Sequence, residues 1–380
     1  MVNSALGIIF PNQYDELVPE LTSERLMASI PFASRYRMID FALSSMVNSG
    51  ITNISVLARQ NYHSLMDHLG SGREWDLSRK NGGLTIWPPF AQKSMSVYHG
   101  RIEALDHIIS FLKEQKEQYI ILSDTNIAAS FDFKDFIQAH VDSGADVSCA
   151  YTVQPLPESI MSAKLMNKGM YYTYDIEDGM VKNMYINPQV EGDQNFSMNI
   201  YCMERELMIR LVREAYMQGG VYFERDILLK KLGELKVSAY EFTGYYGRIS
   251  DMKSYFDENM RLLEEENLEA LFSQPVYTKL RDDNPTRYYD GAVVKNVMAA
   301  DGCVIEGNVE NCVLFRGVKI GKGAVVKNCV LMQDTVIEEG AVLDHIITDK
   351  NALVTAGKEV RGTDTFPVFV AKYQVLEGKY

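Results

Sequence analysis

The C-terminal part of the sequence has a six-residue periodicity that very few folds can accommodate. Every sixth residue from Cys312 to Val360 is small or β-branched. These positions are Cys312, Val318, Ala324, Val330, Val336, Val342, Thr348, Val354 and Val360, and glycines lie between them at Gly317, Gly321, Gly323 and Gly340. The pattern predicts a parallel β-helix of about three coils, in which each hexapeptide forms one side of a triangular coil. Chance alternation in an ordinary β domain is the alternative.

The first 260 or so residues have a different organisation, in which short apolar runs alternate with helical patterns. Residues 101–115 form one such helical pattern, because their apolar side chains recur on one face. The predicted strands are Ala5–Phe10, Ile54–Arg59, Tyr119–Asp124, Val147–Val153, Ser197–Met203 and Val237–Phe242. This alternation predicts an α/β, Rossmann-like domain with a mostly parallel sheet and ligands at the carboxyl ends of its strands.

We therefore expect three regions: an α/β domain over residues 1–265, a connector over 266–290 and the β-helix over 291–380. The net charge of −13 argues against nucleic acid or an anionic membrane as a partner, because both attract a basic surface. No apolar run approaches the roughly 20 residues of a membrane span, and no signal peptide is evident. The five cysteines include no CxxC pair, which favours buried, reduced thiols in a cytoplasmic protein.

The segment after the first strand lacks the features of a phosphate-binding loop. Such a loop is usually rich in glycine, so that backbone amides can approach the phosphate closely. Here the strand Ala5–Phe10 runs into Pro-Asn-Gln-Tyr-Asp-Glu, and no glycine occurs between Gly7 and Gly50. The first lysine of the chain is Lys80. The segment is either a phosphate site of another design or one that has lost its function.

Three stretches identify a family. The stretch Arg35–Ile51 reads RYRMIDFALSSMVNSGI, Asn284–Tyr288 reads NPTRY, and Val313–Met332 reads VLFRGVKIGKGAVVKNCVLM. They closely resemble the bacterial glucose-1-phosphate adenylyltransferases (ADP-glucose pyrophosphorylases), and most of all their GlgD-type subunits, along nearly the full chain. The resemblance implies a nucleotidyltransferase domain, a left-handed β-helix and a tetramer. It also implies synthesis of ADP-glucose and pyrophosphate from ATP and glucose 1-phosphate with Mg²⁺.

The catalytic positions of that family are altered here, and we find none intact. The glycine-rich loop is replaced by Pro11–Leu17, whose acidic residues would repel a triphosphate, and Met27 stands where the family has a lysine. Asn187 replaces the lysine of a sugar-phosphate motif, Glu-Lys-Pro. Arg248 stands where an aspartate helps to hold the metal, and a guanidinium cannot act as a metal ligand.

Other family positions are retained. Asp124 matches the main metal-binding aspartate, but because its catalytic partners are missing we favour a structural role as a strand-end cap over that of a working metal ligand. The resemblance also places Gly100 near the nucleotide, and Ser197 and Met198 near the glucose, as vestigial substrate contacts.

Four arginines are candidates for a regulatory phosphate site. In relatives, activating sugar phosphates bind near the junction of the two domains through basic residues. Arg25, Arg35 and Arg37 are retained here, and Arg316 is expected nearby. They would bind a sugar-phosphate effector, or they would form ion pairs at the surface and between the domains.

These observations favour a catalytically impaired regulatory subunit that modulates a catalytic paralogue in a cytoplasmic heterotetramer of glycogen biosynthesis, with a homo-oligomer possible when it is alone. The chain itself would require no cofactor, and Mg²⁺ would serve the active complex. One alternative is a weakly active nucleotidyltransferase that uses Asp124. Another is an acyltransferase in the β-helix, where His345 is the only histidine available as a base.

Overall fold

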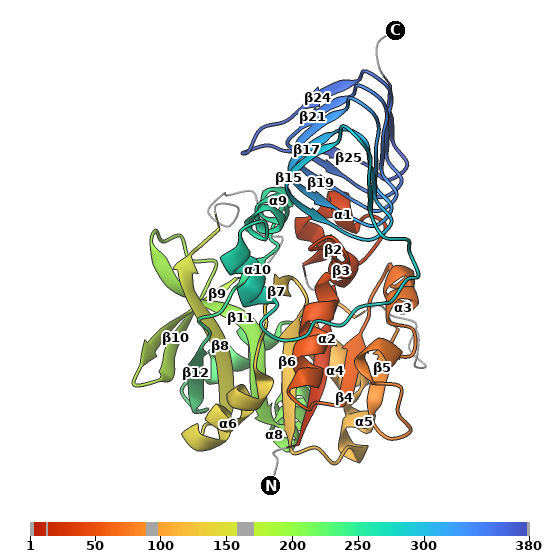
Figure 1. The fold of residues 1–380 in the computed structure, drawn as a ribbon. Helices are drawn as coiled ribbons and strands as arrows, with labels where there is room; N and C mark the ends of the chain where they lie inside the picture. The colour runs from red at the N-terminus through yellow and green to blue at the C-terminus, as the bar shows by residue number, and fades with distance from the viewer. Residues whose placement is uncertain (1–3, 13, 89–97, 158–170, 378–380) are drawn as a thin grey trace.

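A computed structural model describes residues 4–12, 14–88, 98–157 and 171–377. An α/β part carries a β-helix at one end, with the N-terminus and the C-terminus at opposite ends of the molecule (Figure 1). Within these ranges no helix is long and apolar enough to cross a membrane. All five cysteines are free and buried, as expected.

The α/β part is built on a nine-stranded sheet with the order β5-β4-β1-β6-β11-β8-β12-β10-β9. The strands are β1 (Ala5–Phe10), β4 (Asn53–Leu57), β5 (Gly83–Trp87), β6 (Tyr119–Asp124), β8 (Val147–Pro155), β9 (Tyr172–Glu177), β10 (Met180–Ile186), β11 (Asp193–Glu204) and β12 (Val237–Glu241). The predicted strands all form, and β1 and β6 have the predicted bounds. The expectation of parallel strands holds for β5-β4-β1-β6 and for β8–β12. Strands β11 and β10 run in the opposite direction, so the sheet is mixed.

Helices pack on this sheet, and α1 and α9 lie where the α/β part meets the β-helix (Figure 1). The helices of the described ranges are α1 (Pro19–Thr22), α2 (Met38–Asn48), α3 (His63–Leu69), α4 (Arg101–His107), α5 (Ile109–Glu114), α6 (Phe133–Ser143), α8 (Arg205–Met217), α9 (Met252–Arg261) and α10 (Glu265–Leu271). The single helix expected over 101–115 is two helices that meet at Ile108. Alternate residues of β6 enter different cores, since Ile121 packs on one face and Ile120 and Leu122 on the other.

The β-helix consists of parallel strands stacked in two principal sheets. One contains β14 (Arg287–Tyr288), β16 (Val304–Ile305), β18 (Lys319–Ile320), β20 (Val336–Ile337), β23 (Leu353–Val354) and β26 (Val375–Leu376). The other contains β15 (Val293–Ala299), β17 (Asn308–Leu314), β19 (Val325–Leu331), β21 (Val342–Asp344), β22 (Ile346–Thr348), β24 (Glu359–Arg361) and β25 (Val368–Val370). Six strands stack in the first sheet, so the solenoid has more coils than the roughly three expected.

The predicted six-residue step loses its phase within these coils. Lys319, Val336 and Leu353 stack on one another, and each coil between them is one residue shorter than three hexapeptides. Val336 and Val342 are therefore only half-buried, while their neighbours Ile337 and Leu343 are 1% exposed. The repeat is real, but its inward-facing positions shift by one residue along the chain.

The β-helix packs on the α/β part of the same chain. Val313, Val330 and Ile347 belong to the same buried cluster as the residues of α2 and β1, and α9 contacts β17 and β19. Between α10 and β14 the chain crosses the face of the α/β part before it enters the first coil (Figure 1). Within the expected connector, Leu271 at the end of α10 is fully buried, and β14 already pairs with β16.

Candidate functional site

Three buried charged residues meet at the carboxyl end of β6. Asp124 is the last residue of that strand, Arg101 is the first residue of α4, and Glu224 begins a π-helical turn, Glu224–Leu229. Their exposed fractions are 3%, 2% and 1%. Arg101 donates from Nη2 to Asp124 Oδ2 and from Nη1 to Glu224 Oε1. One guanidinium therefore bridges two carboxylates that come from distant parts of the sequence.

In this cluster, burial and the neighbouring charges shift the pKa values of Asp124 and Arg101 in opposite directions. Burial raises the pKa of Asp124 to about 6, against the opposing effect of the Arg101 charge. Burial also disfavours the charge of Arg101, but Asp124 and Glu224 outweigh it and hold the Arg101 pKa well above its usual range. Arg101 is thus a permanently charged partner for both carboxylates.

The site does not fit the Mg²⁺ that the resemblance implies. Magnesium is held by carboxylates, substrate phosphates and several waters in near-octahedral geometry. Asp124 and Glu224 are already bridged by Arg101, and no group of three or more His, Cys, Asp or Glu side chains in the described ranges could hold a metal. Asp124 is therefore an ion-pair partner of Arg101 in this structure.

Arg248 lies in an aromatic cage near this cluster and does not contact Asp124. It ends β13 (Gly247–Arg248), and its Nη1 donates to the Ser197 carbonyl at 3.1 Å and the Tyr246 hydroxyl at 3.0 Å. Its guanidinium carbon lies 4.5 Å and 4.6 Å from the ring centroids of Phe196 and Tyr171. Cation–π attraction and these hydrogen bonds stabilise the buried charge. Arg248 is 4% exposed, so the residue at a family metal position is part of the core.

Tyr14 places an aromatic ring where the family has its glycine-rich loop. The residue is 3% exposed and stacks on Tyr171 at 5.8 Å between ring centroids. Asn199, at the position of a family glycine, donates from Nδ2 to the Tyr14 hydroxyl at 2.6 Å. The ring is also 5.5 Å from the Arg248 guanidinium carbon. The loop after β1 thus fills the end of the sheet with side chains.

Asp15 and Met27 close this loop against the core. Asp15 Oδ1 accepts the Met27 backbone N–H at 2.7 Å, and the Met27 side chain is 1% exposed within the core. Burial raises the pKa of Asp15 to about 7. The acidic residue therefore fixes the backbone of the residue that replaces the family lysine.

The other predicted substrate positions have structural partners. Asn187 Oδ1 accepts the Tyr171 N–H at 2.7 Å, and the Asn187 N–H donates to the Tyr171 carbonyl at 2.8 Å. Ser197 Oγ accepts the Tyr174 hydroxyl at 2.7 Å, and Met198 is fully buried. These contacts position the walls of the aromatic cage.

Gly100 has a packing role that needs no ligand. A Cβ atom at this position would lie 2.3 Å from the Val221 carbonyl oxygen. The Val221 carbonyl accepts the Ile102 N–H at 3.3 Å, so the start of α4 is held against this segment. Close approach of two backbones explains the glycine.

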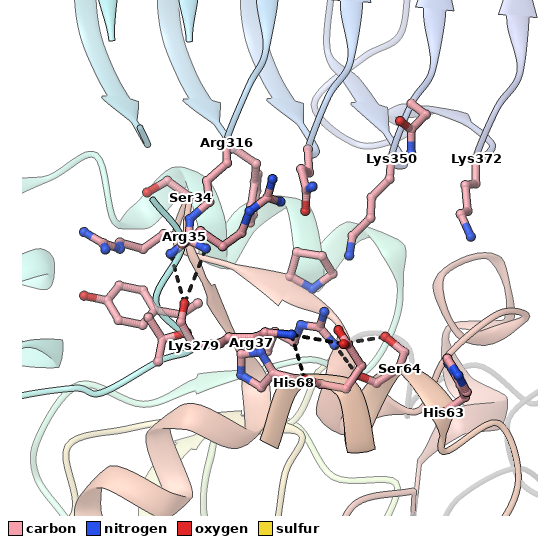
Figure 2. Close-up of a pocket in the computed structure, with 18 of the residues that line it drawn as sticks. Ser34, Arg35, Arg37, His63, Ser64, His68, Lys279, Arg316, Lys350 and Lys372 are labelled. Carbon is pink, nitrogen blue, oxygen red and sulfur yellow. Dashed lines mark hydrogen bonds and ion pairs between the residues drawn. The ribbon is translucent and has the colours of Figure 1, made fainter. Parts of the chain in front are cut away.

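A second candidate site is a cationic cavity of about 530 Å³ between the α/β part and the β-helix. Arg316, Lys350 and Lys372 extend from the β-helix, and Arg35 and Arg37 lie opposite them (Figure 2). The other charged lining residues in the described ranges are Lys279, Arg281 and a single carboxylate, Asp67, and the histidines His63 and His68 also line the cavity. The positive charges greatly outnumber the negative charge, as expected for a site that binds an anion.

Three cations of this cavity, Lys279, Arg281 and Lys372, form ion pairs with Asp67, Asp283 and Glu24, whereas Arg35 and Arg37 have weaker or uncharged partners. Arg37 donates to the Ser64 carbonyl at 2.8 Å, and Arg35 has a long, exposed ion pair with Asp301 at 3.8 Å. Burial lowers the pKa of Arg37. Burial, with the nearby arginine charges, lowers the pKa of Lys350 to about 7. A bound anion would relieve this repulsion.

The cavity contains three of the four predicted phosphate ligands. Arg35, Arg37 and Arg316 line it, but Arg25 does not. Arg25 is buried in an ion pair with Asp349, with Nη2 2.8 Å from both carboxylate oxygens. The four arginines were expected either to bind a phosphate or to form ion pairs, and Arg25 forms an ion pair between the two parts of the chain.

His345, the one histidine of the β-helix, is placed for packing. Its Nδ1 lies 2.8 Å from Asp344 Oδ1, and its ring lies 5.9 Å from that of Phe256 in α9. Its backbone has a φ of +51°, as expected at a corner of the coil.

Sequence reasoning missed the residues that decide both sites. Arg101 directly follows Gly100, which the resemblance places near the nucleotide, but its partner Glu224 is more than a hundred residues away and no local pattern joins them. A charged residue beside the apolar positions of α4 was the only signal. Lys350 and Lys372 look like ordinary surface lysines of a coil, and only folding brings them to Arg37.

Comparisons with known proteins agree with the resemblance. The family model described as nucleotidyl transferase matches residues 16–265, and that of a GlmU-like C-terminal hexapeptide region matches 281–366. Glycogen biosynthesis protein GlgD of Bacillus subtilis is 34% identical over 97% of this chain and 96% of its own length. GlgD of Geobacillus stearothermophilus is 36% identical over 86% and 84%. A glucose-1-phosphate adenylyltransferase of Clostridium perfringens is 30% identical over 81% and 79%.

Proposed function

This chain belongs to the glucose-1-phosphate adenylyltransferase family of nucleotidyl transferases, alongside the GlgD proteins, and we propose that it is a catalytically impaired, regulatory member. Its relatives support a role in glycogen biosynthesis. The reaction it would modulate joins ATP and glucose 1-phosphate into ADP-glucose and pyrophosphate.

The observation that carries this proposal is the occupation of the catalytic region by the chain's own side chains. Phosphoryl transfer needs cations and amides around the phosphates and an accessible metal. Tyr14 fills the end of the sheet beside β1, and Arg101 engages the carboxylate of Asp124. With Arg248 and Asp124 both buried, the region has the packing of a core.

We further propose that the chain works as a partner of a catalytic paralogue in a cytoplasmic heterotetramer. The paralogue would supply the active site and use Mg²⁺, while this chain would require no cofactor. A left-handed sense of the β-helix coil, as in the family, is part of the same proposal. The scaffold that relatives share is retained over nearly the whole chain, which supports a role that depends on its surfaces.

The cationic cavity is the proposed regulatory site. A sugar phosphate carries the dianionic group that Arg35, Arg37 and Arg316 can bind with charge-assisted hydrogen bonds. Because the cavity lies between the two parts of the chain, a bound effector would hold them together. The resulting change would reach the catalytic subunit through the interface, as a coupling between sites.

The experiment is a mixing assay with the glucose-1-phosphate adenylyltransferase from the same organism. We expect no ADP-glucose formation by this chain alone. Titration into the catalytic subunit should change its turnover or its response to sugar phosphates, and the two should co-elute. Arg37→Ala should reduce the effector response of the mixture while co-elution is retained. If the two chains do not co-elute and the kinetics of the catalytic subunit do not change, the proposal is wrong.

The alternative is a weakly active nucleotidyltransferase that uses Asp124, which is retained at the end of β6. It predicts ATP-dependent turnover by the isolated chain that is lost in Asp124→Asn. The contact between Asp124 and Arg101 argues against it, because that carboxylate is not available to a metal. The isolated-chain assay above decides between the two functions.

A further inference from the structure

The contacts of Arg101 with Asp124 and Glu224 join three separate elements of the fold. Asp124 comes from the end of β6, Arg101 from the start of α4 and Glu224 from the π-helical turn. The Tyr172 hydroxyl lies 3.5 Å from the second Glu224 oxygen, Oε2. Two carboxylates thus converge on a common point, and that point is occupied by one guanidinium.

The charges of this region are balanced without any added ion. The four buried charged groups are Arg101, Arg248, Asp124 and Glu224, and both arginine charges act on Asp124. A divalent cation between the two carboxylates would leave two positive charges in excess in a buried region. Such an excess is strongly unfavourable at low dielectric.

We propose that the Arg101 guanidinium is a built-in counter-ion that occupies a latent divalent-cation site formed by Asp124 and Glu224. The wild-type chain is closed to metal at this point because its own side chain supplies the positive charge. This inference rests on the buried contacts alone, and it holds whether or not the chain regulates a catalytic paralogue. It explains why Asp124 is retained while other catalytic positions are altered: the carboxylate is needed as a partner for Arg101.

Removal of the guanidinium should convert the pair into a metal site. Arg101→Ala leaves Asp124 and Glu224 facing each other with space between them, and two buried carboxylates repel one another. A hard divalent cation with oxygen ligands relieves that repulsion. Mn²⁺ is a suitable probe because it accepts the same oxygen ligands and is paramagnetic.

The test measures Mn²⁺ binding by electron paramagnetic resonance, and thermal unfolding with Mn²⁺ or with EDTA, on the full chain. The wild type should show no stoichiometric site and no shift of its unfolding midpoint. Arg101→Ala should unfold at a lower temperature in EDTA, regain stability with Mn²⁺ and bind one Mn²⁺ at least about tenfold more tightly than the wild type. The matched control Arg101→Ala with Glu224→Gln should lose this response.

Two outcomes would overturn the proposal. One is a wild-type Mn²⁺ site that disappears in Asp124→Asn, since Arg101 would then not exclude the metal. The other is a folded Arg101→Ala that does not respond to Mn²⁺.

Failure of Arg101→Ala to fold is also informative, because a second variant removes all three charges. Arg101→Met with Asp124→Asn and Glu224→Gln should fold without metal. If Arg101→Ala folds only when it is refolded with Mn²⁺, the proposal is supported. If it does not fold even with Mn²⁺ while the uncharged variant folds, the carboxylates cannot accept a cation and the proposal is wrong. Neither result depends on association with a catalytic subunit.

Discussion

Arg25 and Asp349 form a buried bidentate ion pair between the α/β part and the β-helix, with Arg25 Nη2 2.8 Å from both carboxylate oxygens. The side chains are 3% exposed. Asp349 Oδ1 also accepts the backbone N–H of Lys350 at 2.7 Å. One ion pair therefore joins the two parts of the chain and fixes the backbone of a lysine that lines the cationic cavity.

Breaking this pair should destabilise the protein strongly. Arg25→Ala leaves the Asp349 carboxylate buried without its partner, a change that costs about 3–5 kcal/mol in comparable pairs. Urea unfolding of Arg25→Ala, Asp349→Ala and the double variant gives the coupling energy. The apolar pair Arg25→Met with Asp349→Leu should recover most of the loss. A loss below about 1 kcal/mol in Arg25→Ala, typical of a surface pair, would contradict the expectation.

Gly100→Ala should reduce stability because of packing. The added Cβ would lie 2.3 Å from the Val221 carbonyl oxygen, so α4 must shift, at a cost of about 1–3 kcal/mol. Gly233→Ala is the matched control, since a Cβ there meets nothing within 4 Å. Chemical denaturation without any nucleotide compares the two. If the two variants are equally stable, packing does not explain Gly100, and the earlier interpretation as a substrate contact is favoured.

Asp15 should make the protein less stable as the pH rises. Its pKa is about 7 in the folded chain and 3.8 ordinarily, so the folded state holds a proton that the unfolded state has lost. Stability therefore falls from about pH 4 to pH 7 and is constant beyond. Asp15→Asn retains an acceptor for the Met27 N–H and removes this dependence. We expect it to be more stable than the wild type at pH 8 and equal near pH 4. Glu20→Gln, which changes an exposed carboxylate of α1, is the control, and a less stable Asp15→Asn at pH 8 would show this account to be wrong.

The cationic cavity should bind anions more tightly at lower pH. Lys350 has a pKa of about 7, so it gains its charge as the pH falls from about 8.5 to 6. Sulfate is the appropriate probe in calorimetry, because its own charge is constant over this range. Lys350→Met should weaken sulfate binding and reduce its pH dependence. Sulfate affinity that is independent of pH in the wild type would exclude Lys350 as a ligand.

Lys350 should also affect the free energy of unfolding, with a pH dependence opposite to that of Asp15. The pKa of Lys350 is lowered from 10.5 to about 7, so burial of its charge costs stability below pH 7, and this cost fades as the pH rises to about 10.5. Without anion, Lys350→Met should be more stable than the wild type at pH 6.5 and equal to it above pH 10.5. Lys372→Met is a comparison from the same wall of the cavity. If the stability gain of Lys350→Met is the same above pH 10.5, it comes from apolar packing of the methionine and not from removal of a buried charge.

Much of the fold follows from local patterns in the sequence. Residues 5–10 and 119–124 form strands with the predicted bounds, since a short, largely apolar run is typical of a strand that is buried on both faces of its sheet. The repeat after Cys312 indicates a β-helix because each coil must return its apolar residues to one interior. The sequence did not predict which residue of each hexapeptide faces inward, because the length of each coil depends on how its corners stack on the next coil.

The sequence by itself determined the family, the two architectures and the loss of catalytic residues at Met27, Asn187 and Arg248. Only the tertiary structure decided what replaced them. Arg101 finds Glu224 across a sequence separation that no periodicity spans, and Lys350 reaches Arg37 only when the β-helix docks. Periodicity reports which face of an element is apolar, whereas the energy of a buried charge depends on the groups that folding brings to within a few ångströms of it.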